Sequence, residues 1–233
     1  MTILADADLS TIAELMTGHR ASLLLALIGG RPLTASELAA RAGISRSLTS
    51  SHLSRLLDGG LIHVEQQGRQ RHYRLAGPAI AEVIEGMVTI APQRAAASNP
   101  AAKRGNEIRH ARTCYDHLAG ILGVAICDAL QHQRILKPAD NSYRLTSAGE
   151  KRLASLGVDI DHLRTRRRAF ARPCLDWTER RPHLAGALGA GLADRLIGLD
   201  WVRRTPGTRA VRLTPLGQQR LRDELALNLT ADA

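Results

Sequence analysis

The sequence predicts a mainly α-helical protein with short β-hairpins, divided into two parts, and three observations support this fold class. Residues 34–75 show two short helical patterns followed by two strand patterns. Residues 92–106 are rich in alanine and contain almost no large apolar side chain. Residues 107–233 contain an internal repeat. We therefore expect a first domain at 1–91, a linker at 92–106 and a second domain at 107–233.

The first helix of the 34–75 pattern is expected to begin after Thr34. Thr34-Ala-Ser-Glu37 has the spacing of a capping box, in which both side chains accept hydrogen bonds from backbone N–H groups at a helix start. Apolar residues then recur at helical spacing up to Gly43, the residue type that most easily adopts the left-handed conformation that ends a helix. Upstream, residues 9–15 and 20–28 are apolar helical segments that are expected to complete the core.

A second helix, from the N-cap Ser45 to about Asp58, is expected to have an unusual exposed side. Its buried side is predicted to consist of Ile44, Leu48, Leu53, Leu56 and Leu57. The other side carries short hydrogen-bonding groups where a solvated helix normally carries Glu and Lys, and such groups can approach base edges and phosphates. The DNA-contacting candidates on this helix are Arg46, Ser47, Thr49, Ser50, Ser51, His52 and Arg55. Two alternatives remain open: His52 packs against its neighbours, and Arg55 is simply solvated.

Two strands are expected to follow Gly59-Gly60, at residues 61–64 and 71–75, with a turn at 66–69. Arg69 and Arg71 of this hairpin would reach phosphates or the minor groove beside the second helix. Two helices followed by such a hairpin make a winged helix-turn-helix, in which the hairpin is the wing. Its use for protein contacts instead of DNA contacts is the alternative.

At these residues the chain resembles the ArsR/SmtB (arsenic-repressor) family of bacterial regulators, over roughly residues 10–90. The resemblance implies a homodimer that places two recognition helices in successive major grooves of a palindromic operator and represses until an effector binds. It also implies that the first helix and the helix after the wing form the dimer contacts. The matching residues are Gly43-Ile44-Ser45-Arg46-Ser47, Ser50-Ser51-His52-Leu53, Leu56, Gly60-Leu61-Ile62 and Gly68-Arg69-Gln70-Arg71-His72-Tyr73-Arg74-Leu75.

The chain departs from that family at both of the family's usual metal sites. The Cys-x-Cys pair of many members is replaced by Ser36-Glu37-Leu38-Ala39-Ala40, which offers no thiolate. The helix after the wing, where zinc-sensing members carry Asp and His ligands, offers only Glu82 and Glu85. We therefore expect both of these sites to be absent.

The positive charge of the chain is unevenly distributed between its two parts. The formal net charge is +10, but residues 1–91 hold eight Arg against eight Asp or Glu. Residues 92–233 hold 24 Lys or Arg against 14 acidic residues, so the whole excess lies in the second part. A positive excess favours nucleic acid as a partner. The densest basic stretch is Arg164-Thr165-Arg166-Arg167-Arg168, which is interpreted as a solvated helix face, a contact to DNA phosphates or a pocket for an anionic metabolite.

The composition favours the cytoplasm. Segments long and apolar enough for a membrane span are lacking, and residues 1–9 contain Asp6 and Asp8 without the basic residues of a secretory signal. Three cysteines without a close pair do not form a disulfide framework.

The internal repeat consists of two segments, about 114–156 and about 180–224. His117-Leu-Ala-Gly-Ile-Leu-Gly123 returns 66 residues later as His183-Leu-Ala-Gly-Ala-Leu-Gly189, and the motif at Tyr143–Gly149 returns at Val211–Gly217. Each copy is predicted to be a helix, a hairpin and a helix capped by Thr146 or Thr214, and the copies would pack about a pseudo-twofold axis. The paired glycines indicate a close approach to the backbone, either by the crossing repeat helices or by a ligand.

Candidate effector residues cluster just before each repeat: Cys114, Asp116, His117, Cys174, Asp176 and His183. Cys114 and His117 are expected on one helical face, at i and i+3. Two thiolates with one or two imidazoles would complete a tetrahedral site for a soft metal. Oxidation of the thiols and simple core packing of the cysteines are the alternatives. The metal and any cofactor remain unknown.

Catalytic motifs such as a phosphate-binding loop, a nucleophile elbow or His-Glu-x-x-His are lacking, so no enzymatic activity is expected. The leading hypothesis is a dimeric repressor that binds double-stranded DNA and responds to a small-molecule, redox or metal effector through its second part. The alternatives are a nucleoid-type protein that binds DNA without sequence preference, and an enzymatic ligand-processing domain fused to a DNA-binding module.

Overall fold

The structure is a computed structural model that describes residues 9–91 and 106–229. It divides into two compact units, Met1–Glu85 and Gly86–Ala233, which we describe separately. The expected linker at 92–106 lies outside the described residues except for Asn106. Among the helices of the described parts, none is long and apolar enough to cross a membrane.

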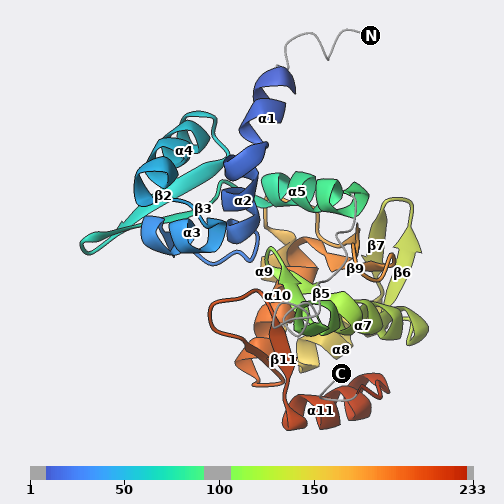
Figure 1. Cartoon of the computed structure of the whole chain (residues 1–233). Coiled ribbons are helices and arrows are strands. Elements are labelled where there is room, and N and C mark those ends of the chain that lie inside the picture. Colours follow the sequence, from blue (N-terminus) through green and yellow to red (C-terminus); the bar gives the residue numbers. More distant parts are fainter. Residues whose placement is uncertain (1–8, 92–105, 230–233) are drawn as a thin grey trace, which may run out of the picture. The chain divides into compact units, whose positions relative to one another are not determined.

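The first unit is a winged helix-turn-helix (Figure 1). Its three antiparallel strands are ordered β1-β3-β2, and the hairpin of β2 and β3 extends away from the helices (Figure 1). Helix α5 begins in this unit and runs past its end. The elements are α1 (Leu9–Leu15), α2 (Gly18–Leu27), β1 (Leu33–Thr34), α3 (Ala35–Ala42), α4 (Arg46–Asp58), β2 (Ile62–Gln67), β3 (Gln70–Leu75) and α5 (Pro78–Ile90).

Local side-chain chemistry sets the ends of α3 and α4 as predicted. The Thr34 hydroxyl accepts a hydrogen bond from the Glu37 N–H at 3.3 Å, and the Glu37 carboxylate accepts one from the Thr34 N–H at 2.8 Å, which completes the capping box. Gly43 ends α3 with a φ of 66°. Ser45 caps α4 by accepting a hydrogen bond from the Leu48 N–H at 3.2 Å. The short strand β1, which pairs Leu33 with Tyr73, was not predicted.

One prediction about the core of this unit was wrong. Leu48 was expected on the buried side of α4, but 39% of its surface is exposed. The buried positions of α4 are Thr49, Leu53 and Leu56, which recur at i, i+4 and i+7 and so form one helical stripe. Because that stripe passes through Thr49 in the first turn, Leu48 lies beside it.

The second unit contains two runs of elements in the same order, hairpin, helix, hairpin and helix, with α9 between them (Figure 1). Thr146 and Thr214 cap the last helix of each run, as predicted, by accepting hydrogen bonds from Gly149 N–H at 3.0 Å and Gly217 N–H at 2.9 Å. One continuous apolar cluster includes residues of both runs, such as Leu122 and Leu188. The first run is β4 (Arg112–Cys114), β5 (His117–Ala119), α7 (Gly120–His132), β6 (Leu136–Ala139), β7 (Ser142–Leu145) and α8 (Ser147–Ser155). After α9 (Ile160–Arg164), the second run is β8 (Arg172–Leu175), β9 (Pro182–Ala185), α10 (Gly186–Gly198), β10 (Val202–Arg204), β11 (Val211–Leu213) and α11 (Pro215–Leu225).

The hairpins β4–β5 and β8–β9 correct a second prediction. Cys114 and His117 do not share a helical face, because they lie opposite each other in the β4–β5 hairpin. Tertiary contacts hold this segment extended: the Thr113 N–H donates to the Arg209 carbonyl at 2.9 Å, and Arg112 forms a bridge with Ala210. Such pairing with a distant segment overrides local helical periodicity.

The paired glycines serve a different contact from the predicted crossing of repeat helices. Helices α7 and α10 start at Gly120 and Gly186, which have φ values of 75° and 86°. A Cβ on Gly123 would lie 2.5 Å from the Leu118 carbonyl oxygen, and a Cβ on Gly189 would lie 2.4 Å from that of Leu184. Each helix therefore packs its first turn against the backbone of the hairpin that precedes it.

Candidate functional site

The exposed side of α4 and the wing form a polar surface, which we call the α4–wing surface. Its exposed members are Arg46, Ser47, Ser50, Ser51 and Arg55 of α4 together with Arg69 and Arg71 of the hairpin. The helix presents hydroxyl groups and two guanidinium groups, and the hairpin adds two further guanidinium groups. Groups of this kind bind phosphates and base edges.

Two of the predicted DNA-contacting residues on α4 are placed differently. Thr49 is completely buried, and its hydroxyl donates to the Ser45 carbonyl at 2.8 Å, so the prediction that Thr49 faces DNA was wrong. His52 is half-buried and packs against His19, with ring centroids 5.9 Å apart. Burial, and then the nearby Arg20, lower the pKa of His52. A neutral imidazole in this position gives no charge-assisted phosphate contact.

The second unit contains a buried cluster that we call the Cys/His cluster: Cys114, His117, Cys174 and His183. One ligand atom from each residue lies within 4.8 Å of all the others. The two sulfur atoms are 3.9 Å apart, and the two imidazole Nε2 atoms are 3.2 Å apart. Cys174 is half-buried and the other three are buried. The structure thus brings together four residues that the sequence offered as effector candidates.

Two hairpins position these four side chains. Strand pairing sets Cys114 opposite His117 in β4–β5 and Cys174 opposite His183 in β8–β9. Each hairpin also packs against the helix of the other run, since β9 contacts α7 and β5 contacts α10. Gly189 of α10 eases the approach of β5, because it has no Cβ to contact His117. A Cβ on Gly189 would lie 3.3 Å from the His117 Cβ.

Two carboxylates, both predicted as effector candidates, lie behind the imidazoles. Asp116 Oδ1 is 3.3 Å from Nδ1 of His117, and Asp176 Oδ2 is 3.2 Å from Nδ1 of His183. Because each Nδ1 faces a carboxylate, the two Nε2 atoms are directed into the cluster. Carboxylates in this position fix the orientation and tautomer of a histidine.

Two arginines that were not predicted at this site hold the carboxylates. Arg112 is fully buried and donates to both oxygens of Asp176 at 2.9 Å. Arg168 donates to Asp116 Oδ2 at 2.6 Å. Arg168 lies in the basic stretch that was interpreted as a solvated helix face, a contact to DNA phosphates or a pocket for an anionic metabolite. A signal for Arg112 was available in the sequence, because it lies two residues before Cys114 just as Arg172 lies two before Cys174.

Neighbouring groups in the cluster shift the pKa values of Asp176, Cys174 and His183. Burial alone would raise the pKa of Asp176, but His183 and Arg112 lower it well below its usual range. The pKa of Cys174 is also lowered, first by a hydrogen bond from Cys114 and then by the two histidines, against the effect of burial. Burial lowers the pKa of His183, whereas Asp176 and Cys174 raise it more strongly, so the net shift is upward. These shifts favour a thiolate at Cys174, the form in which cysteine binds metals.

Other basic residues of the second unit also have acidic partners. Arg164 donates to both carboxylate oxygens of Glu150, at 3.0 and 2.9 Å. Arg181 donates to Asp128 at 2.8 Å. Part of the positive excess is thus neutralised inside the unit.

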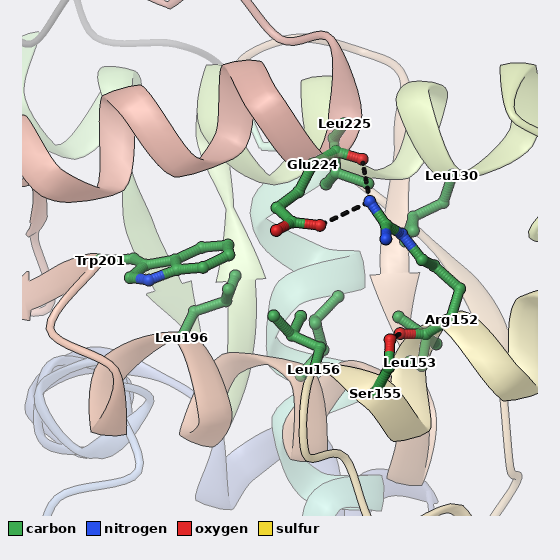
Figure 2. A pocket seen from close by; sticks show the side chains of 10 residues that line it. Leu130, Arg152, Leu153, Ser155, Leu156, Leu196, Trp201, Glu224 and Leu225 are labelled. Carbon is green, nitrogen blue, oxygen red and sulfur yellow. Dashed lines mark hydrogen bonds and ion pairs between the residues drawn. The ribbon is translucent and has the colours of Figure 1, made fainter.

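A separate small cavity lies between α7, α8, α10 and α11 in the second unit (Figure 2). Its volume is about 110 Å³, and leucines and Trp201 form most of its lining. Figure 2 shows Arg152 directed toward Glu224, and the two side chains form an ion pair at 2.5 Å. Pockets for drug-sized ligands usually have volumes of ~300–1,000 Å³. The cavity is therefore a weaker effector candidate than the Cys/His cluster.

Comparisons with known proteins agree with the architecture of the first unit. The model of a helix-turn-helix domain family matches residues 15–65. The chain is 43% identical over 214 residues to YdfF of Bacillus subtilis (strain 168), described as an uncharacterized HTH-type transcriptional regulator, and the match covers 91% of this chain and 95% of YdfF. It is 32% identical over 90 residues to the HTH-type transcriptional regulator YgaV of Escherichia coli (strain K12), covering 36% of this chain and 91% of YgaV.

Two solved structures similar to the chain each cover less than two fifths of it. The NMR structure of the cadmium metal-sensor CMTR from Mycobacterium tuberculosis is 31% identical, with a TM-score of 0.32, over 39% of this chain and 100% of that chain. Reduced HlyU from Vibrio cholerae is 25% identical, with a TM-score of 0.33, over 36% of this chain and 88% of that chain.

The match to YdfF covers 91% of this chain and therefore includes both units. This coverage is sufficient to assign the class of protein. The chain belongs to the family of helix-turn-helix transcriptional regulators. Its first unit is the winged helix-turn-helix that the resemblance to ArsR/SmtB regulators predicted, so that recognition is confirmed. Regulators of this class bind DNA and control transcription.

Proposed function

We propose that the protein is a homodimeric repressor that binds a palindromic operator through its α4–wing surface and releases it in response to an effector sensed by residues 107–233. In this proposal residues 1–91 form the DNA-binding and dimerisation domain. The exposed hydroxyl and guanidinium groups at the start of α4 are the observation that carries the proposal. A helix N-terminus rich in such groups can enter a major groove and read base edges.

The wing contributes two arginines to the same surface. Arg69 lies at the exposed hairpin turn, and Arg71 follows on β3 with its guanidinium 5.7 Å from the Tyr73 ring centroid. We assign phosphate or minor-groove contacts to both arginines. Such contacts add affinity that falls with salt and carry little sequence information.

The second unit is the proposed sensing part. We infer that its two runs of elements are two structural repeats, because the repeated sequence motifs occupy the same elements in both runs. The Cys/His cluster takes one cysteine and one histidine from each run, so it depends on how the two runs pack. A change in the cluster would be transmitted to both runs together.

Binding of a selected inverted-repeat DNA by the full-length protein tests this function. We expect selection from random duplexes to yield an inverted repeat with half-sites about one helical turn apart. Arg46→Ala is expected to weaken binding to that DNA by about 1–3 kcal/mol and to reduce base discrimination. Arg69→Ala is expected to weaken binding to all duplexes similarly and to reduce the salt slope by about one.

Arg74→Ala is a matched control, because Arg74 lies on the same strand as Arg71 and is paired with Glu65. It removes the same charge from the same hairpin and is expected to change affinity less than Arg69→Ala. Equal binding to the selected repeat and to random duplex would instead favour the nucleoid-type alternative.

A further inference from the structure

Two interatomic distances in the Cys/His cluster match edges of a tetrahedron of ligands around a zinc ion. Zinc binds thiolate sulfur at ~2.3 Å and imidazole nitrogen at ~2.0–2.1 Å, so a regular tetrahedron separates two sulfur ligands by ~3.8 Å and two nitrogen ligands by ~3.3 Å. The observed separations are 3.9 Å between the sulfur atoms and 3.2 Å between the Nε2 atoms. Both edges therefore agree with the tetrahedron to within about 0.1–0.2 Å.

We propose that Cys114, His117, Cys174 and His183 bind one Zn²⁺-class ion per chain in a closed tetrahedral site. The ligand set of two thiolates and two imidazoles is one that zinc prefers. The site lies in the second unit and does not rest on the DNA-binding function proposed above. It also differs in position from the metal sites implied by the family resemblance, which would lie on α3 and α5.

The surroundings of the ligands favour a metal site over ordinary core packing. Each histidine directs Nε2 to the cluster and Nδ1 to a carboxylate, Asp116 or Asp176. This is the carboxylate–histidine arrangement that orients imidazole ligands in metal sites. The carboxylates are in turn held by Arg168 and Arg112.

The topology of the ligands indicates what the ion does. The β4–β5 hairpin contributes Cys114 and His117, and the β8–β9 hairpin contributes Cys174 and His183. One ion would join two hairpins that are about 60 residues apart in sequence. Four protein ligands leave no open position for substrate, as in structural zinc sites. The half-buried Cys174 is the most accessible ligand for entry of the ion.

Metal analysis of the full-length protein, purified without chelator, tests the stoichiometry. We expect about one zinc per chain by inductively coupled plasma mass spectrometry, and less than a tenth of that in the Cys114→Ser/Cys174→Ser double variant. Cys127→Ser is the matched control, because Cys127 is buried in α7 and contacts the Tyr143 hydroxyl at 3.6 Å, outside the cluster. This control should retain the full zinc content.

Cobalt substitution tests the geometry independently of zinc retention. Co²⁺ added to the metal-free wild-type protein should give the intense visible and thiolate charge-transfer absorption of a tetrahedral site, saturating at one equivalent. His117→Gln should alter this spectrum and Cys127→Ser should not. If the double variant fails to fold, the wild-type comparison remains decisive: added Zn²⁺ should raise the melting temperature of the metal-free protein, and Mg²⁺ should not.

Three results would overturn the proposal. The first is a wild-type protein that is isolated without metal and gives only the weak spectrum of octahedral Co²⁺. The second is an unchanged zinc content in the double variant. The third is a Cys114–Cys174 disulfide in the native protein, detected by mass spectrometry as a loss of two hydrogens, which would assign the cluster to thiol oxidation instead.

Discussion

Arg112 shows how much of the second unit depends on a single residue. Its side chain is fully buried, as is that of its partner Asp176. The carboxylate of Asp176 also accepts hydrogen bonds from the N–H groups of Gly120 at 2.7 Å and Thr178 at 2.9 Å. The guanidinium group lies 4.7 Å from the Trp177 ring centroid. The pair thus connects β4 with the loop after β8 and with the first residue of α7.

We predict that Arg112→Met lowers the free energy of unfolding by about 3–5 kcal/mol, because the variant leaves the Asp176 carboxylate buried without its cation. Urea unfolding of the full-length protein measures this change. Arg112→Met/Asp176→Asn should recover part of the loss. Arg109→Ala is the control, since Arg109 is mostly exposed in its ion pair with Glu179, and it should cost about 1 kcal/mol or less. Equal losses for Arg112→Met and Arg109→Ala would contradict the prediction.

At the candidate sites, residue types in the sequence indicated which chemical groups are present but not whether those groups are buried. Cys114, His117, Cys174 and His183 were named because a thiol and an imidazole occur together near each copy of the repeat. Their meeting in one cluster was only a suggestion until the hairpins were placed. The burial of Thr49 was missed, because a threonine beside serines on a helix looks polar although its hydroxyl bonds back to its own helix.

At the scale of elements, α10 offers an internal comparison between two glycines. Gly189 lies in the first turn, where an added Cβ would lie 2.4 Å from the Leu184 carbonyl oxygen. Gly198 is the last residue of the same helix, and an added Cβ there would meet nothing within 4 Å. Gly189 is needed for close packing of the hairpin on the helix, whereas Gly198 has no such packing role.

Gly189→Ala is therefore expected to destabilise the protein by about 1–3 kcal/mol, because a backbone carbonyl cannot move aside as a flexible side chain can. Gly198→Ala should be neutral or stabilising by up to ~1 kcal/mol, because alanine restricts the unfolded chain more than glycine. Thermal and urea unfolding of both variants compare the two effects. A Gly189→Ala variant as stable as Gly198→Ala would show that β9 can shift away from α10.

Several elements with a local signal were predicted, although α9, which Asp159 caps, was missed. The capping box at Thr34, the caps at Ser45, Thr146 and Thr214, and the wing were all read from short-range patterns. The strands β4, β5, β8 and β9 were missed because their pairing partners and packing neighbours decide their conformation. The buried strands β4 and β5 also lack the alternation of polar and apolar residues that marks a half-exposed strand.

At the scale of the whole molecule, α5 presents an exposed apolar face. Val83, Met87 and Ile90 are 51%, 46% and 83% exposed. Their spacing of i, i+4 and i+7 places them on one side of the helix. A contiguous exposed apolar stripe commonly marks a protein interface. In the proposed homodimer this face packs against the second copy of the chain.

We expect Val83→Glu/Met87→Glu to convert the protein to a monomer and to weaken binding of the inverted-repeat DNA at least tenfold, because one half-site alone supplies about half of the contacts. Sedimentation equilibrium measures the mass, and fluorescence anisotropy measures DNA affinity. Leu216→Glu is the control, since Leu216 is a similarly exposed apolar residue on α11. A dimeric double variant would place the interface elsewhere.

The sequence by itself determined the winged helix-turn-helix, its capped helices and the residue types available for recognition and metal binding. These features follow from interactions between residues a few positions apart, which leave short-range patterns. Only the tertiary structure decided that Arg112 and Arg168 support the two carboxylates, that Thr49 is buried, and that four ligand atoms from two distant hairpins meet within 4.8 Å. Those features depend on contacts between segments far apart in the chain, and local sequence patterns do not predict such contacts.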